Sequence, residues 1–176
     1  MRMAPTLDTG DILLQESTVI LPEENEEALH DRLAGIGAST LVNALEMLEQ
    51  KKANFIKQDE KLATYARKIT KEDGHIVWNE AARAIHDRVR ALSRWPGTFT
   101  FYKDKRILIR KASVTTHTQP GSVPGQVIAA SEKEGILIAT KTGALKAEEL
   151  QLEGRKALPA ALFLQGFALR VGDILE

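Results

Sequence analysis

The sequence predicts an α+β protein in which the tail of an α/β domain is followed by a small β-barrel or sandwich with flanking helices. Residues 11–50 pass from a β-prone apolar run into apolar residues at helical spacing, which is typical of the end of an α/β domain. From residue 98 onwards, short β-prone runs alternate with glycine turns at close, even spacing, which is typical of a small barrel or sandwich.

The first 50 residues predict one strand and two helices. Residues 11–21 (DILLQESTVIL) form an apolar run that predicts a strand in need of neighbours, since a lone strand is not stable. The acidic residues 23–27 suit the positive end of a helix dipole. Because Gly35 and Gly37 interrupt the helical pattern that follows, we predict two helices joined near them and ending around residue 50. The apolar positions of this pattern are Ala28, Leu29, Leu33, Ile36, Leu41, Val42, Leu45 and Leu48.

A polar linker and a third helix come next. Residues 51–75 are mostly polar and charged, which predicts an interdomain linker anchored by Tyr65 and Ile69. Asn79 is suited to cap a helix that runs to about residue 92. Trp95-Pro96-Gly97 should end this segment. The apolar face of the helix would consist of Ala82, Ile85, Val89 and Leu92.

The remaining residues predict strands and one further helix. Residues 98–102 and 106–114 should form a hairpin around Lys103-Asp104-Lys105. Leu158-Pro159 should begin a helix that extends through Phe167, with the proline in the first turn. The other expected strands are residues 126–130, 135–140, 144–152 and a closing strand at 171–175, with turns at Gly121, Gly125, Gly135, Gly143 and Gly154.

The net charge of zero conceals an uneven distribution along the chain. Residues 1–60 hold 5 Lys/Arg and 12 Asp/Glu (−7), residues 61–115 hold 13 and 5 (+8), and residues 116–176 hold 6 and 7 (−1). A basic central segment could attract a polyanion such as a nucleic acid, although a solvated basic surface without a partner is the alternative.

Composition excludes several classes of protein. The chain has no cysteine, so a disulfide framework and a thiolate metal site are excluded, and we predict no metal site. It has no apolar run long enough to span a membrane and no secretory signal at residues 1–15. We expect a cytoplasmic protein.

The sharpest short motif is Asp8-Thr9-Gly10-Asp11. Asp-Thr-Gly is also found in aspartic proteases, where two carboxylates share a proton. Those proteases are all-β, need a second aspartate and usually continue the triplet with Ser or Ala, so the helices expected at residues 24–50 argue against this class. A tight turn is the structural alternative.

The motif is one of several runs that resemble the methionyl-tRNA formyltransferase family, in order along the whole chain. These runs are residues 7–13 (LDTGDIL), 29–33 (LHDRL) with Gly37, 58–59 (QD), 63–69 (ATYARKI), 71–72 (KE), 76–78 (IVW), 90–91 (RA), 95–97 (WPG), 124–128 (PGQVI), 154–156 (GRK) and 163–166 (FLQG) with Gly172. The resemblance implies a formyltransferase that uses 10-formyltetrahydrofolate as formyl donor.

The resemblance also implies a fold, a domain division and a catalytic residue. Residues 1–55 would be the tail of the Rossmann-like formyltransferase domain, residues 56–75 a basic linker, and residues 76–176 an OB-like barrel that binds tRNA. In the family an Asn, a His and an Asp carry the formyl transfer, and the role of the Asp falls on Asp8. The Asp orients the His, which moves a proton, while the Asn steadies the developing oxyanion.

The chain departs from the family pattern where catalysis is concerned. It has no His-Pro-Ser run and no Ser-Leu-Leu-Pro folate motif, and none of its four histidines lies in a catalytic context. His30 and His86 are expected on helices as surface or packing residues. We therefore expect the chain to be the C-terminal part of a longer protein, to be inactive alone and to bind the folate poorly.

The implied partner is initiator methionyl-tRNA, with no DNA or membrane partner, and a monomer is expected. Contacts from basic residues would go to phosphates and give a salt-dependent affinity. Phe99 and Phe101 alternate on one strand face and are expected in the core rather than as stacking platforms. Three alternatives remain: a non-catalytic RNA-binding module, a sugar-nucleotide formyltransferase and a formyltetrahydrofolate-hydrolysing protein. The candidate tRNA-binding residues are Lys68, Lys71, Arg88, Arg90, Arg94, Lys103, Lys105, Arg106, Arg110, Lys111, Arg155 and Lys156.

Overall fold

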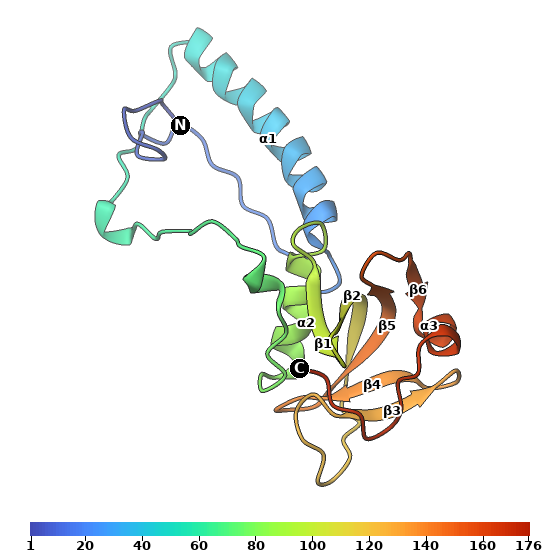
Figure 1. The fold of residues 1–176 in the computed structure, drawn as a ribbon. Coiled ribbons are helices and arrows are strands. Elements are labelled where there is room, and N and C mark those ends of the chain that lie inside the picture. The colour runs from blue at the N-terminus through green and yellow to red at the C-terminus, as the bar shows by residue number, and fades with distance from the viewer. The chain divides into compact units, whose positions relative to one another are not determined.

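The computed structural model describes all residues from 1 to 176. It divides into two compact units, Met1–Lys68 and Ile69–Glu176 (Figure 1). No helix is long and apolar enough to cross a membrane.

The first unit contains one long helix, α1 (Glu26–Glu49), and a short 3₁₀ helix, η1 (Glu60–Leu62). The Asn25 side chain caps α1 by accepting a hydrogen bond from the Ala28 backbone N–H. The helix runs through Gly35 and Gly37, so the predicted break is wrong. A glycine costs about 1 kcal/mol relative to alanine in a helix, which lowers its stability without ending it.

The strand predicted at residues 11–21 is also wrong. Only Ile12 forms a bridge, with Ile56, and the segment that follows has no regular structure. The side chains of Val19 and Ile20 are 72% and 65% exposed, so the apolar run has no partner strand within the chain. The apolar side of α1 is exposed as well, since no residue of this helix is buried.

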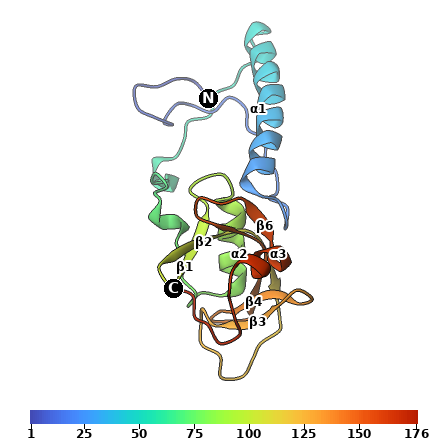
Figure 2. The same ribbon diagram turned by 45° about the vertical axis from the view of Figure 1, so that its right-hand side comes forward.

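The second unit is an antiparallel sheet in the order β1-β2-β5-β4-β3, with β6 paired to β5 (Figure 1). Figure 2 shows the paired strands β3 and β4 side by side. Its strands are β1 (Thr98–Tyr102), β2 (Lys105–Thr115), β3 (Val127–Ser131), β4 (Gly135–Ala139), β5 (Ala144–Leu152) and β6 (Ala157–Pro159). Five of these strands were predicted to within one or two residues, whereas β6 was predicted as the start of a helix. The β1–β2 turn consists of Lys103 and Asp104, both with positive φ, which is the two-residue hairpin that matches the twist of the strands.

Three helical elements accompany the sheet: η2 (Glu72–Gly74), α2 (Ala82–Ala91) and α3 (Ala160–Gly166). The predicted capping by Asn79 is wrong, because the residue at the N-cap of α2 is Ala81 and it gives no side-chain hydrogen bond. The Ala82 N–H instead donates to the Thr142 carbonyl between β4 and β5, so a tertiary contact satisfies the first N–H of the helix.

The predicted apolar face of α2 is confirmed. It packs on β2 and β5, and Ala82, Ile85, Val89 and Leu92 are all buried. The core continues through Ile107, Ile109, Val127, Ile136, Ile138, Leu145, Leu150, Phe163, Leu169 and Leu175. His86 is buried on the same helix and His30 is exposed on α1, as expected for packing and surface residues.

The C-terminal tail connects the two edge strands of the sheet (Figure 1). It exchanges two backbone hydrogen bonds between Glu176 and Phe101 on β1. It also bonds the other edge, where Val127 of β3 donates to Asp173 and accepts from Gly172. The tail therefore occupies the position of the predicted closing strand, although only Ile174 forms a β-bridge, with Gln126.

Candidate nucleic-acid interface and the Asp-Thr-Gly turn

The Asp-Thr-Gly motif forms a tight turn in the first unit. Asp8 has φ of 57°, a left-handed conformation that aspartate tolerates better than most residues. The Gln58 side-chain amide donates to the carbonyl oxygens of Asp8 (2.8 Å) and Gly10 (2.7 Å). A Cβ at Gly10 would overlap the carbonyl oxygen of Arg2, so the close approach of these two segments requires glycine.

Gln58 belongs to one of the runs that resemble the family, but the sequence did not show that it holds this turn. It lies 50 positions from Asp8, and both of its bonds go to backbone carbonyls, which have no sequence signal. Because the Gln58 amide donates to both carbonyl oxygens, it fixes the backbone conformation of the turn from which the Asp8 side chain extends.

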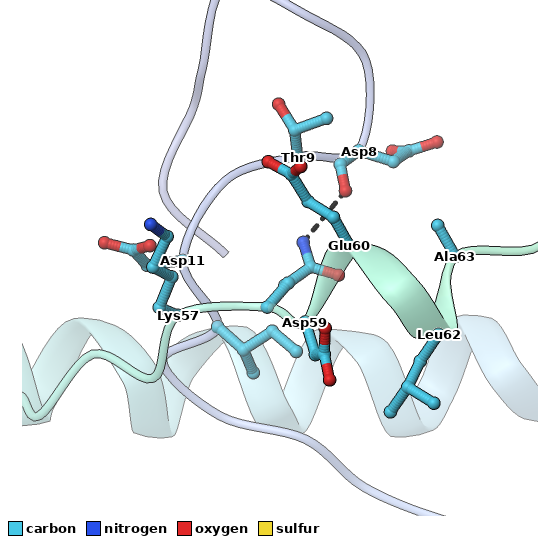
Figure 3. A pocket seen from close by; sticks show the side chains of 10 residues that line it. Asp8, Thr9, Asp11, Lys57, Asp59, Glu60, Leu62 and Ala63 are labelled. Carbon is cyan, nitrogen blue, oxygen red and sulfur yellow. Dashed lines mark hydrogen bonds between the residues drawn. The ribbon is translucent and has the colours of Figure 1, made fainter.

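A hollow lies between this turn and η1, with a volume of about 380 Å³ (Figure 3). Its lining contains four carboxylates and one ammonium group, and it includes neither a histidine nor an asparagine. Asp8 therefore has none of the partners that formyl transfer is expected to need within reach. The charged lining residues are Asp8, Asp11, Asp59, Glu60 and Lys57.

Five of the basic candidates lie at one end of the sheet, on the β1–β2 turn, at the start of β2 and on the β5–β6 turn. The two turns adjoin, since Glu153 N–H donates to the Arg106 carbonyl and the two side chains form an ion pair of 3.2 Å. The acidic neighbours Asp104 and Glu153 offset only part of the charge. The five basic residues are Lys103, Lys105, Arg106, Arg155 and Lys156.

A double irregularity in the β2–β5 pairing exposes two further candidates. The register shifts between Ile109 and Lys111 and again between Lys111 and Ala112. Because of these bulges, the consecutive side chains of Arg110 and Lys111 both lie exposed, where regular pleating would place one of them on the buried face. The sequence alternation alone did not predict this.

Lys111 forms an ion pair with Glu148, with 3.4 Å between the ammonium nitrogen and a carboxylate oxygen. Partial burial of Glu148 opposes its ionisation, but hydrogen bonds from Ser113 and Lys111 lower its pKa below the usual value. The Lys111 side chain is 70% exposed, so the pair is screened by solvent and leaves the ammonium accessible.

The arginines of α2 are different, because carboxylates of the same unit already bind them. Arg88 pairs with Glu80 at 2.9 Å, and Arg90 pairs with Asp87 at 2.7 Å. Burial opposes ionisation of Asp87, but Arg90 and Arg83 lower its pKa below the usual value. Arg94, Lys68 and Lys71 are exposed.

The aromatic residues of β1 are largely in the interior, as expected for the core. Phe99 is 8% exposed, and its ring is covered by the Arg106 guanidinium at 3.8 Å and by the His75 ring at 5.4 Å between centroids. Phe101 is only half-buried, so the expectation is confirmed for Phe99 and not fully met by Phe101.

Residues 68–168 match the family described as "Formyl transferase, C-terminal domain". The chain belongs to this family. Curated relatives named methionyl-tRNA formyltransferase are 41% identical over 172 residues in Geotalea daltonii and 39% identical over 175 residues in Moorella thermoacetica. They match 98% and 99% of this chain, and this chain spans about half of their length (54% and 56%).

Solved structures share the fold of this family member at low sequence identity. A variant of HypX from Aquifex aeolicus has a TM-score of 0.68 and 19% identity, over 98% of this chain and 33% of that chain. An N-formyltransferase from Helicobacter canadensis, in complex with folinic acid and dTDP-3-aminofucose, has a TM-score of 0.63 and 14% identity, over 89% of this chain and 53% of that chain. The small mixed α/β domain with an antiparallel sheet is thus the fold of formyltransferase C-terminal domains.

Proposed function

We propose that the chain is the C-terminal part of a cytoplasmic methionyl-tRNA formyltransferase, which formylates initiator methionyl-tRNA with 10-formyltetrahydrofolate in translation initiation. Relatives of that name, about 40% identical along nearly the whole chain, support this assignment over a sugar-nucleotide or hydrolytic formyltransferase. In this assignment the chain supplies mainly the tRNA-binding domain, as a monomer.

The observation that carries the tRNA-binding role is the grouping of exposed cations in the second unit. The two adjoining turns at one end of the sheet bring together residues that are far apart in sequence, and the β2 bulge exposes Arg110 and Lys111 in addition. Cations spread along a surface suit a phosphate backbone, because each contact releases counterions and none needs to read a base.

The proposal keeps the domain division expected from the resemblance. Residues 1–55 would complete a Rossmann-like catalytic domain, residues 56–75 would link the domains, and residues 76–176 would form an OB-like barrel. The hydrogen bonds of the C-terminal tail to both edge strands support the barrel, since they leave neither edge open.

Asp8 would be the one catalytic residue that this chain contributes. Its carboxylate would orient a histidine from the other half of the protein, and the Gln58 amide would hold the turn that presents it. The lining of the adjacent hollow contains no histidine, which supports a mechanism in which the proton-transferring histidine comes from the other half of the protein.

A formyl-transfer assay tests the proposal. The purified chain, given 10-formyltetrahydrofolate and charged initiator tRNA, should bind the tRNA and produce no formylmethionyl-tRNA. The protein that also contains the residues upstream of Met1 should produce it, and replacing Asp8 with asparagine there should abolish most of the activity. Formylation by the chain alone would overturn the assigned roles.

A further inference from the structure

A groove of about 540 Å³ lies in the second unit, between the C-terminal end of β5, β6 and α3. The elements around it adjoin one another, since α3 contacts both β5 and β6 (Figure 1). The volume falls within the range of about 300–1,000 Å³ that is usual for ligand sites. The expected phosphate contacts account for the three cations that line it, but not for its aromatic part.

The charged groups of the groove are all positive. Lys105, Arg155 and Lys156 line it, and no carboxylate does. Arg155 and Lys156 are exposed on a turn whose backbone is held by two hydrogen bonds: Gln151 donates to the Arg155 carbonyl at 2.7 Å, and Arg155 N–H donates to Leu152 at 2.9 Å. The cations are therefore carried on a fixed turn and are open to a ligand.

The apolar part of the groove is aromatic. Phe163 is buried and Phe167 is half-buried, with 5.1 Å between their ring centroids. The Tyr102 ring meets Phe167 edge-on at 6.0 Å, and the Lys105 ammonium lies 5.7 Å from the centre of the Phe167 ring. Phe167 is thus supported by two rings and retains partly exposed apolar surface next to three cations.

We infer that this groove binds one unpaired nucleotide of an RNA, with its base against Phe167 and its phosphate on Arg155 and Lys156. A base has an apolar face that stacks on an aromatic ring, and a guanidinium binds phosphate through paired hydrogen bonds. A double helix keeps its bases stacked inside, so the ligand has to be single-stranded or splayed out. The inference deepens the proposed tRNA-binding function and rests on it for the RNA.

The test measures binding of the full chain to two probes by fluorescence anisotropy. One probe is a single-stranded oligouridylate of about six nucleotides, and the other is a blunt RNA duplex of similar charge. The variants are Phe167→Leu, which keeps an apolar side chain without the ring, and Arg155→Gln with Lys156→Gln, which changes only exposed side chains. Lys141→Gln is the matched control, an exposed lysine beyond the opposite end of β5.

Phe167→Leu should weaken the oligouridylate about tenfold and leave the duplex within about twofold, because only the unpaired base stacks. The Arg155/Lys156 variant should weaken both probes, and the control should change neither. Equal affinity of Phe167→Leu and the unchanged chain for oligouridylate, with both folded by circular dichroism, would overturn the groove assignment.

Binding of initiator tRNA by the same variants separates this inference from the proposed function. If tRNA binds with a steep salt dependence while Phe167→Leu has no effect on oligouridylate, the groove assignment fails and the tRNA-binding role stands. If oligouridylate binding depends on Phe167 while tRNA does not bind, the groove is a nucleotide site and the tRNA-binding role fails.

Discussion

Replacing Thr100 with valine tests how the second unit is held together. The Thr100 side chain is fully buried; its hydroxyl accepts a hydrogen bond from the Trp78 indole N–H at 2.9 Å and donates one to the main-chain oxygen of Glu176 at 2.6 Å. Valine has nearly the same shape, so no cavity forms. The change removes only the hydroxyl that joins β1 to the segment before α2 and to the C-terminal tail.

The magnitude follows from the two lost bonds. Trp78 is 5% exposed, and leaving its N–H without an acceptor should cost about 1–3 kcal/mol. Loss of the bond to Glu176 adds about 1 kcal/mol. For a domain of this size each kcal/mol lowers the thermal midpoint by about 4 °C, so we expect a decrease of roughly 8–16 °C.

The assay is thermal unfolding followed by circular dichroism, in a double-mutant cycle with Trp78→Phe. In the phenylalanine background Thr100→Val should cost only about 1 kcal/mol, because no indole N–H is then left without an acceptor. The same cost in both backgrounds would refute the reasoning, since it would mean that the Trp78–Thr100 hydrogen bond contributes nothing to stability.

Three further predictions concern the charges and the turn. Replacing Arg110 and Lys111 together with glutamine should make the slope of log affinity for tRNA against log salt shallower by about 1.5–2, measured as anisotropy at several salt concentrations; an unchanged slope would mean that the bulge does not contact RNA. Gln58→Ala should speed hydrogen exchange of the Arg2 and Ile12 amides, which donate to Asp11 and Ile56 beside the Asp-Thr-Gly turn, without altering exchange in the sheet; equal rates in both proteins would contradict the structural role of Gln58. Because the folded-state pKa of Asp87 is lowered, its contribution to stability should be present above pH of about 4 and be lost as pH falls through that lowered pKa; Asp87→Asn should flatten this part of the curve of unfolding free energy against pH, and identical curves would contradict it.

The second unit could be predicted well because its signals are local. Positive φ at Lys103 and Asp104 closes a hairpin between two runs whose boundaries are visible in the sequence. The apolar face of α2 follows from residue spacing, and turn glycines such as Gly143 adopt the positive φ that favours glycine. Each of these elements is specified within about a dozen residues.

The elements that could not be predicted depend on distant partners. The N-terminus of α2 is set by the Thr142 carbonyl, some 60 residues away, so the nearby Asn79 was a false cap. The β-prone run at residues 11–21 has no partner strand in this chain, and without one it remains irregular. The secondary-structure propensity of a segment indicates which structure it can form, and its tertiary contacts determine whether that structure forms.

In the candidate site, too, the local features could be predicted from the sequence, whereas the features that depend on distant residues could not. Counting charges predicted a basic segment, but it did not show that Glu80 binds Arg88 or that a bulge exposes Arg110 beside Lys111. Nor did it show that the β5–β6 turn adjoins the β1–β2 turn. The side chains of one surface come from different strands that are paired in the sheet. Which of them lie together can therefore be predicted only once the register of the strands is known.

The most direct test of the central claim is the binding of initiator tRNA to the purified chain at about 50 mM and about 200 mM salt. With several phosphate contacts, the affinity should fall by about 10³-fold across this range. Absence of binding at the lower salt concentration, by a chain shown to be folded, would contradict the tRNA-binding role.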